Sequence, residues 1–194
     1  MPTTARLDRL SSGTARDSIS AVQPGVVAMI EFAEHLGRSS TLVELERDYL
    51  RGVGQFVDLP IRGLYLLDPV SELPVHGAGE NVSDFFMRRS ETVGRALDPM
   101  LAVVRQEHRA SYNLEVMPGP DWVATPLYQQ VAGLHGMAHV IESPAISDGQ
   151  LLGTLNFAGS SPPADPDRCV EIAQILGRLV GQAIATVRCR DASD

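Results

Sequence analysis

The sequence predicts an α+β domain with a mainly antiparallel central sheet of five to six strands and helices on both faces. One observation is the stretch 136–160, which reads as two alternating strands joined by a tight turn. The other is the order along the chain, in which helix-periodic segments precede, separate and follow short strand-like segments. With 194 residues, 44% of them hydrophobic, the chain can fill one core without a second domain.

The amino-terminal part is predicted to be a leader followed by helices. Residues 1–20 are rich in Ser, Thr, Arg and Asp without periodicity, which predicts a disordered leader. In residues 21–40 apolar residues recur at spacings of three and four up to Gly37, which predicts an amphipathic amino-terminal helix. The tetrad 41–44, Thr-Leu-Val-Glu, has the form of a capping box that starts a second helix. Residues 41–190 form the predicted globular domain.

The middle of the chain alternates between strands and short helices. Residues 61–68 and 73–78 alternate in the manner of strands and predict a first hairpin. Residues 83–97 have a weak pattern, which predicts a helix or an irregular segment. Asp98 and Pro99 then supply a cap and a first-turn proline for a short helix.

A strand, a helix, the central hairpin and a terminal helix complete the prediction. Residues 112–117 predict a short strand, and Asp121 is expected to cap the following helix because Pro118-Gly-Pro120 interrupts regular structure. Asp148-Gly149 suits the tight turn of the hairpin. Pro144 must lie where no strand partner needs its amide. Asp165-Pro166 begins a long helix with a wide apolar face.

The second half of the chain resembles a known family. Residues 128–140, Pro144 and the run Gly-Thr-Leu-Asn-Phe at 153–157 look like the carboxy-terminal half of a GAF domain. They are most similar to the GAF domains that precede DNA-binding modules in bacterial, LuxR-type transcriptional regulators. The resemblance extends over roughly residues 41–188, and it implies a small-molecule-binding sensory domain for signalling or transcription regulation.

The resemblance also implies where a ligand would bind. It places the pocket walls in residues 85–128 and on the inner face of the central strands. Five residues in these regions combine an apolar body with a polar tip, which suits the orientation of a small organic molecule. These candidate ligand-binding residues are Tyr112, Trp122, Tyr128, His135 and His139. Each of them has an alternative role as an ordinary core side chain.

Several other functions were weighed against the sensor. A haem-binding sensor would need an axial ligand such as His76, His108 or His139, but the sequence has no haem attachment motif. A stand-alone GAF-fold enzyme is the alternative, yet both cysteines lie on the terminal helix, where they do not suit methionine sulfoxide reduction. Glu142, His139 or Asp148 could act as a general acid or base, but no nucleophile or metal cluster accompanies them in the sequence. No catalytic residue, metal site or cofactor is therefore assigned, and a pocketless dimerisation module is the third possibility.

Charge and composition limit the partners. A net charge of −8 argues against direct nucleic-acid binding by this chain, which needs clustered Lys and Arg. No apolar run approaches the ~20 residues of a membrane span, and no secretion signal is visible, so we expect a cytoplasmic protein without a membrane contact. Small residues at 177, 181 and 185 form a stripe on the terminal helix. The stripe suits either a homodimer through the terminal helices or close packing on the sheet.

Overall fold

The computed structural model describes residues 14–193, with side chains from residue 25 onward. A single five-stranded sheet forms the centre of the domain, in the order β2-β1-β5-β4-β3, and every neighbouring pair is antiparallel. The strands are β1 (Ile61–Leu67), β2 (Pro74–Glu80), β3 (Ser111–Tyr112), β4 (His139–Ser147) and β5 (Gln150–Gly159). The predicted fold class is confirmed.

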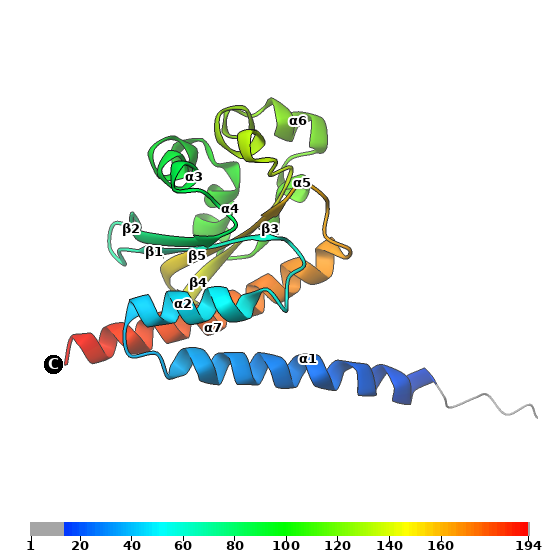
Figure 1. The fold of residues 1–194 in the computed structure, drawn as a ribbon, viewed down its shortest axis with the longest axis vertical. Helices are drawn as coiled ribbons and strands as arrows, with labels where there is room; N and C mark the ends of the chain where they lie inside the picture. The colour runs from blue at the N-terminus through cyan, green and yellow to red at the C-terminus, as the bar shows by residue number, and fades with distance from the viewer. Residues whose placement is uncertain (1–13, 194) are drawn as a thin grey trace, which may run out of the picture.

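Helices cover both faces of this sheet (Figure 1). One layer consists of α1 (Thr14–Gly37), α2 (Leu42–Val53) and α7 (Pro166–Asp191). The opposite layer consists of α3 (Asp84–Arg89), η1 (Ser90–Gly94), η2 (Arg95–Leu97), α4 (Pro99–Glu107), α5 (Asn113–Val116), α6 (Gly119–Ala124), η3 (Tyr128–Ala132) and η4 (Gly133–His135). In this layer η1 and η3 are π-helical, and η2 and η4 are single 3-10 turns.

The main core lies between the sheet and the α2–α7 layer. Leu155 and Phe157 of β5 are fully buried there, against Leu176 and Val180 of α7. Helix α1 packs on the outside of α2 and α7 (Figure 1), with Phe32 edge-on to Phe56 at 5.3 Å between ring centroids. The alternate residues of β5, such as Asn156 and Ala158, point to the opposite face of the sheet. The strand therefore contacts both the main core and the second helical layer.

Local motifs behave as the sequence predicts. Thr41 caps α2, and Asp98 and Asp165 cap α4 and α7 through their side-chain oxygens. Asp148 and Gly149 form the turn between β4 and β5 with φ of 48° and 79°. Pro144 lies on β4 beyond Glu142, where β3 has already ended, so no strand on that side needs its amide.

The boundaries of α1 differ from the prediction. The helix begins at Thr14, so residues 14–20 of the predicted leader are helical, and residues 1–13 lie outside the described residues. It also passes through Pro24. Two residues assigned to the amphipathic face, Val26 and Ile30, are more than half exposed. The inward positions are Phe32 and Leu36, which are 4% and 1% exposed.

The strand predicted at 112–117 is wrong beyond Tyr112, because Asn113 ends it. The Asn113 side chain donates to the carbonyl of Ala138 at 3.1 Å and accepts from the amide of Val140 at 2.9 Å. The side-chain amide of Asn113 thus makes the two hydrogen bonds to β4 that the backbone of a longer β3 would have made. The chain then leaves the sheet and forms α5.

The helix predicted to start at Asp121 begins earlier, at Gly119. Pro120 lies in its first turn, where the missing N–H of a proline would have no helical acceptor in any case. The amide of Trp122 already donates to the carbonyl of Pro118 at 2.9 Å. The run Pro118-Gly-Pro120 therefore starts a helix instead of preventing one.

The small-residue stripe of α7 packs against the sheet. A β carbon on Gly177 would overlap the carbonyl oxygen of Pro144, and one on Gly181 would overlap the backbone of Ile146. These two glycines let α7 approach β4 at backbone contact distance. The same helix is long and apolar enough to pass a test for a membrane span, but its apolar face is this buried one, as in the core helix of a globular domain.

Candidate ligand-binding site

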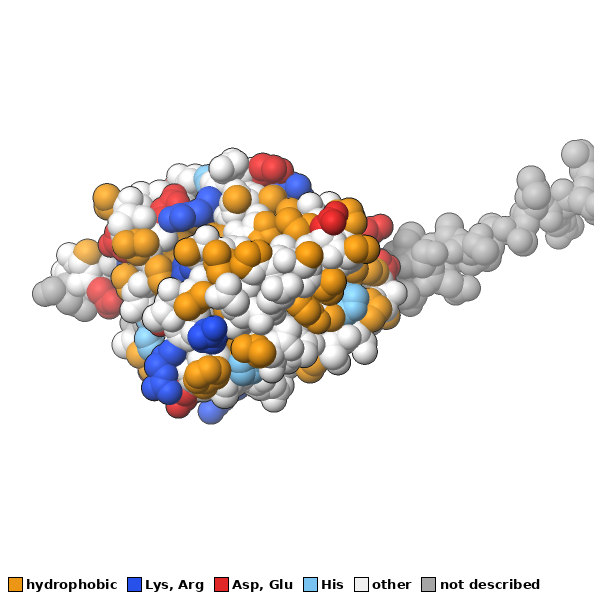
Figure 2. All heavy atoms as spheres, turned by 90° about the horizontal axis from the view of Figure 1, so that it is seen from above, with side chains coloured by type: hydrophobic (Ala, Val, Ile, Leu, Met, Phe, Trp, Pro, Cys, Tyr) orange, Lys and Arg blue, Asp and Glu red, His pale blue; other side chains and the backbone are white. Residues whose placement is uncertain are grey.

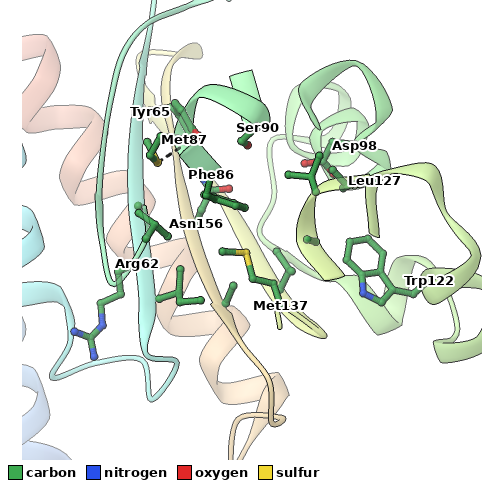
Figure 3. Close-up of a pocket in the computed structure, with 17 residues that line it drawn as sticks. Arg62, Tyr65, Phe86, Met87, Ser90, Asp98, Trp122, Leu127, Met137 and Asn156 are labelled. Carbon is green, nitrogen blue, oxygen red and sulfur yellow. Dashed lines mark hydrogen bonds between the residues drawn. The ribbon is translucent and has the colours of Figure 1, made fainter. Parts of the chain in front are cut away.

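A cavity of about 80 Å³ lies on the sheet face opposite α7. Its floor is formed by β1, β4 and β5, and its walls come from α3, η1, α6 and η3 (Figure 3). The backbone dictates which strand residues reach it, because Ile61, Val140 and Ala158 lie side by side across three strands and share one face. The polar residue Asn156 follows two positions earlier on β5.

One end of the cavity is apolar. Phe86, Leu127, Val131 and Met137 line it together with Trp122. The Trp122 side chain is only 1% exposed, and its indole N–H has no hydrogen-bond partner among the described residues. In Figure 3 the ring nitrogen lies on the edge nearer to Met137. A buried donor of this kind favours an occupant with an acceptor atom.

The other end of the cavity is polar. Tyr65, Ser90, Asp98 and Asn156 line it (Figure 3). Asp98 accepts from the amide of Met100 at 2.8 Å as the cap of α4. Burial raises the pKa of its carboxyl group to about 6, although these amide hydrogen bonds oppose the rise.

Glu142 lies next to this polar end, on the same face of the sheet. It is paired with Asn156 across β4 and β5, and its side chain is almost fully buried. One carboxylate oxygen, Oε2, has no partner in the part of the chain that the structure describes. Burial, and then the negative charge of Asp98, raise the pKa of Glu142 well above its ordinary value. This buried carboxyl group therefore keeps its proton more readily than an exposed glutamate does.

Positive charge is scarce around these carboxyl groups. Arg62 contributes to the cavity wall, but its guanidinium points away (Figure 3) and pairs with Glu80 at 2.7 Å. Arg95 stacks over the Tyr65 ring at 5.6 Å, and its charge lowers the pKa values of both Asp98 and Glu142. The lowering is smaller than the rise from burial in both cases.

The five residues selected from the sequence occupy three places. Trp122 lines the cavity. Tyr128 packs edge-on against Trp122 at 6.1 Å, and His135 packs edge-on against Phe86 at 4.9 Å, so both stand behind the cavity wall. The remaining two, Tyr112 and His139, lie together on the β3–β4 edge of the sheet.

Tyr112 and His139 form a pair of their own. The Tyr112 hydroxyl and His139 Nδ1 are 2.5 Å apart, and the rings stack at 6.0 Å. Burial lowers the pKa of His139, which favours the neutral imidazole as a hydrogen-bond partner. Neither residue is among those that line the cavity within the described chain.

A comparison with protein-family models matches most of the chain. The model of the GAF domain covers residues 41–184. The chain belongs to the GAF domain family. Among curated proteins no sequence matches this chain.

Solved structures share the GAF fold at low sequence identity. A domain assigned to a two-component sensor histidine kinase protein from Sinorhizobium meliloti is 16% identical, with a TM-score of 0.62 over 80% of this chain and 98% of that one. The GAF domain of an Acinetobacter phosphoenolpyruvate-protein phosphotransferase is 13% identical, with a TM-score of 0.59 over 86% and 96%. The VqsR LBD domain from Pseudomonas aeruginosa is 15% identical, with a TM-score of 0.55 over 88% and 98%. At these identities the likeness concerns the fold.

The polar end of the GAF cavity escaped the sequence reading for identifiable reasons. Asp98 was read only as a helix cap, and Glu142 only as an isolated acid. The alternation of β5 did place Thr154 and Asn156 on one face, and two polar residues in the middle of a central strand are a usable signal. What no local pattern shows is that Asp98 and Glu142 come close enough to affect each other's ionisation.

The three histidines that the sequence offered as haem ligands lie outside the lining of the cavity. His76 pairs with Glu46 at 3.1 Å on the α2 side, His108 ends α4 with φ of 52°, and His139 pairs with Tyr112. No histidine is among the described residues that line the cavity. The described lining therefore supplies no histidine to a haem iron.

Proposed function

We propose that this GAF domain is the sensory part of a cytoplasmic bacterial regulator and binds a small organic molecule in the cavity beside Trp122. The observation that carries the proposal is the unpartnered Trp122 N–H in a cavity with one apolar and one polar end. Ligand pockets combine these same features, an apolar lining and a few polar groups that fix orientation. A volume of about 80 Å³ suits a compact molecule, or a larger one that displaces α3 and η3.

The helical layer over the cavity has the properties of a movable cover. Figure 2 views the molecule from the side of α3 and α6 and shows hydrophobic side chains spread over this face. Phe85, Val123 and Leu134 are each about half exposed or more. Arg89, the last residue of α3, joins α3 to the π-helical segment η3, because its Nε donates to the carbonyl of Gln130 at 2.6 Å. Irregular helices with few buried contacts open more easily than a packed core.

The signal would leave through a homodimer formed by the terminal helices. Helix α1 is apolar on its inner side, through Phe32 and Leu36, and again on its outer side. The outer residues Val26, Val27 and Ile30 are 51%, 52% and 54% exposed. An exposed apolar face on a helix whose opposite face is already packed is suited to contact with another helix. The stripe of α7 does not supply this interface, since Gly177 and Gly181 face β4.

A direct route connects the cavity to these helices. Along β5, Asn156 reaches the cavity, while its neighbours Leu155 and Phe157 pack in the core beside α7. A ligand that shifts β5 would therefore shift the sheet surface on which α7 packs, and α1 in turn packs on α7. The shift biases the dimer only if the two helix arrangements bind the ligand with different affinity. The output would be a DNA-binding module, as in LuxR-type regulators, or a separate partner.

Native mass spectrometry of freshly purified protein tests this function. We expect a dimer that carries one small molecule per protomer, released on denaturation. A bare monomer, from cells and after incubation with extract of the source cells, would contradict both the sensor and the dimer. A bare dimer that stays bare with extract would contradict the sensor and favour a dimerisation module. Turnover of the released molecule would favour the stand-alone enzyme.

A further inference from the structure

The side chains that line the cavity offer a ligand almost no free charge. Among the described lining residues only Arg62, Tyr65 and Asp98 can ionise. The Arg62 guanidinium donates to Glu80 at 2.7 Å and lies against Gly54 at the end of α2. Figure 3 shows this guanidinium directed away from the cavity. Burial raises the pKa of the Tyr65 hydroxyl, which therefore stays a neutral phenol.

The carboxyl group of Asp98 is already occupied by the start of α4. It accepts hydrogen bonds from the backbone amides of Met100, at 2.8 Å, and of Leu101. These amides lie at the positive end of the helix dipole, where they stabilise a carboxylate. The positive charge of Arg95 acts on the same group. Asp98 therefore serves as a helix cap whose charge needs no further partner from a ligand.

A charged ligand would enter this cavity without a counterion. A cation would meet a carboxyl group that the helix amides already solvate, and an anion would find no free guanidinium or ammonium group among the described lining residues. Moving an unpaired charge from water into an apolar site costs far more than moving a neutral polar group. The other polar side chains of the lining, Ser90 and Asn156, are neutral. The lining thus favours an uncharged molecule.

The indole of Trp122 adds the requirement for a hydrogen-bond acceptor. Its N–H is buried and has no partner among the described residues. Figure 3 shows the nitrogen on the edge of the ring that faces Met137, another lining residue. A methionine side chain is unbranched and flexible, so Met137 can move aside for an acceptor atom. Phe86, Leu127 and Val131 line the same end and can contact an apolar body.

We propose that the cavity binds a compact uncharged molecule with an ether or carbonyl oxygen that accepts the hydrogen bond of Trp122. This inference rests on the proposed function, since it names the ligand class of the same site. The oxygen would satisfy the buried N–H, and the rest of the molecule would pack among the apolar side chains. Amino acids, organic acids and protonated amines would be rejected, because the described lining does not compensate their charge.

Small probes of matched size test the ligand class at neutral pH. Tetrahydropyran, piperidine and cyclohexane are rings of the same shape that differ at one position, which is an ether oxygen, a protonated amine or a methylene group. Cyclopropanecarboxylate has the same number of non-hydrogen atoms and a negative charge. In proton–nitrogen correlation spectra we expect tetrahydropyran to bind roughly tenfold or more tightly than either charged probe. Tetrahydropyran, unlike cyclohexane, should move the indole proton signal of Trp122 downfield.

Two variants localise the acceptor. Trp122→Phe keeps an aromatic ring in the wall and removes the N–H donor. The ratio of tetrahydropyran affinity to cyclohexane affinity should then fall roughly fivefold or more, as measured on the NMR signals of the probes. Tyr128→Phe is the matched control, because Tyr128 packs on Trp122 at 6.1 Å from behind the wall and loses only a hydroxyl group. It should leave the ratio unchanged. If Trp122→Phe does not fold, the indole signal of the natural chain tests the same hydrogen bond.

The outcomes separate the ligand class from the proposed function. Binding of piperidine or cyclopropanecarboxylate as tight as that of tetrahydropyran, or a retained molecule that is ionised at neutral pH, would overturn the uncharged class while the cavity remains a ligand site. An indole signal that tetrahydropyran leaves in place, or a ratio that both variants change equally, would overturn the role of the Trp122 N–H. No binding of any probe would overturn the proposed function of the cavity, and the inference with it.

Discussion

At the scale of single residues, the carboxyl group of Glu142 makes stability depend on pH. Its pKa is raised in the folded protein above the ordinary value of 4.5 by burial and by Asp98. Between the ordinary pKa and the raised pKa, Glu142 is protonated in the folded protein and deprotonated in the unfolded chain. Unfolding therefore releases a proton, and the stability of the fold decreases as the pH rises. The stabilisation from the protonated form is fully present below about pH 4.5 and is lost as pH rises through the folded pKa. Asp98 has the same effect on stability, because folding raises its pKa from 3.8 to about 6.

Glu142→Gln should remove most of this dependence. Glutamine resembles the protonated acid at every pH, so the variant gains stability relative to the natural chain as pH rises. We expect a gain of roughly 1 kcal/mol or more between about pH 5 and pH 7.5, since one pKa unit corresponds to about 1.4 kcal/mol. Urea unfolding at both pH values measures it. A constant difference would mean that Glu142 titrates normally in the fold.

The Tyr112–His139 pair should matter for the sheet edge and not for the ligand. Tyr112→Phe keeps the ring and removes the hydroxyl that contacts His139. Loss of that hydrogen bond should cost about 1 kcal/mol in urea unfolding. The affinity for the small molecule released from the purified protein should stay within twofold, because neither residue lines the cavity. A tenfold weaker affinity would place the pair in the binding site, as the sequence reading had proposed.

At the scale of elements, the seat of α7 on β4 depends on glycine. Gly177→Ala would place a methyl group on the carbonyl oxygen of Pro144. Because that oxygen belongs to the backbone of β4, the clash is relieved only if α7 and β4 move apart. We expect a loss of about 2 kcal/mol or more, in the range of overpacked cores. Chemical unfolding measures it.

Gly25→Ala is the matched control for this substitution. Gly25 also lies in a terminal helix, but a β carbon there would meet no atom within 4 Å. The change should be neutral or stabilise by up to about 1 kcal/mol, through helix propensity. Equal effects of the two alanines would mean that the α7 stripe is free and available to a partner.

The accuracy of the sequence reading at this scale follows the range of the interactions. Asp98, Asp148 and Asp165 bond or turn within their own segments, so their roles were readable from neighbours alone. Asn113 ends β3 through bonds to Ala138 and Val140, which are distant in sequence, and no local pattern signals that.

The same distinction applies to the cavity. Trp122 was readable as a large side chain with a polar tip, and it does line the cavity. The proximity of Asp98 and Glu142 could not be predicted from the sequence, because only the packing of α4 on β4 brings these two residues together.

At the scale of the whole molecule, the proposed dimer uses the outer face of α1. Ile30→Asp puts a charge among Val26 and Val27 and should convert the dimer to a monomer in light scattering. Val43→Asp is the matched control, because Val43 is 70% exposed on α2 and outside that face. It should leave the mass unchanged. If Ile30→Asp also remains a dimer, α1 does not form the interface.

The most direct test of the account is the indole N–H signal of Trp122 in a proton–nitrogen correlation spectrum. The chain has a single tryptophan, so one resolved peak reports the buried donor in the cavity. We predict that adding back the small molecule released from the purified protein moves this peak and slows its exchange with water, as an acceptor atom of the ligand takes the hydrogen bond. A peak that stays in place while native mass spectrometry shows the same molecule bound would show that the cavity beside Trp122 is not the ligand site.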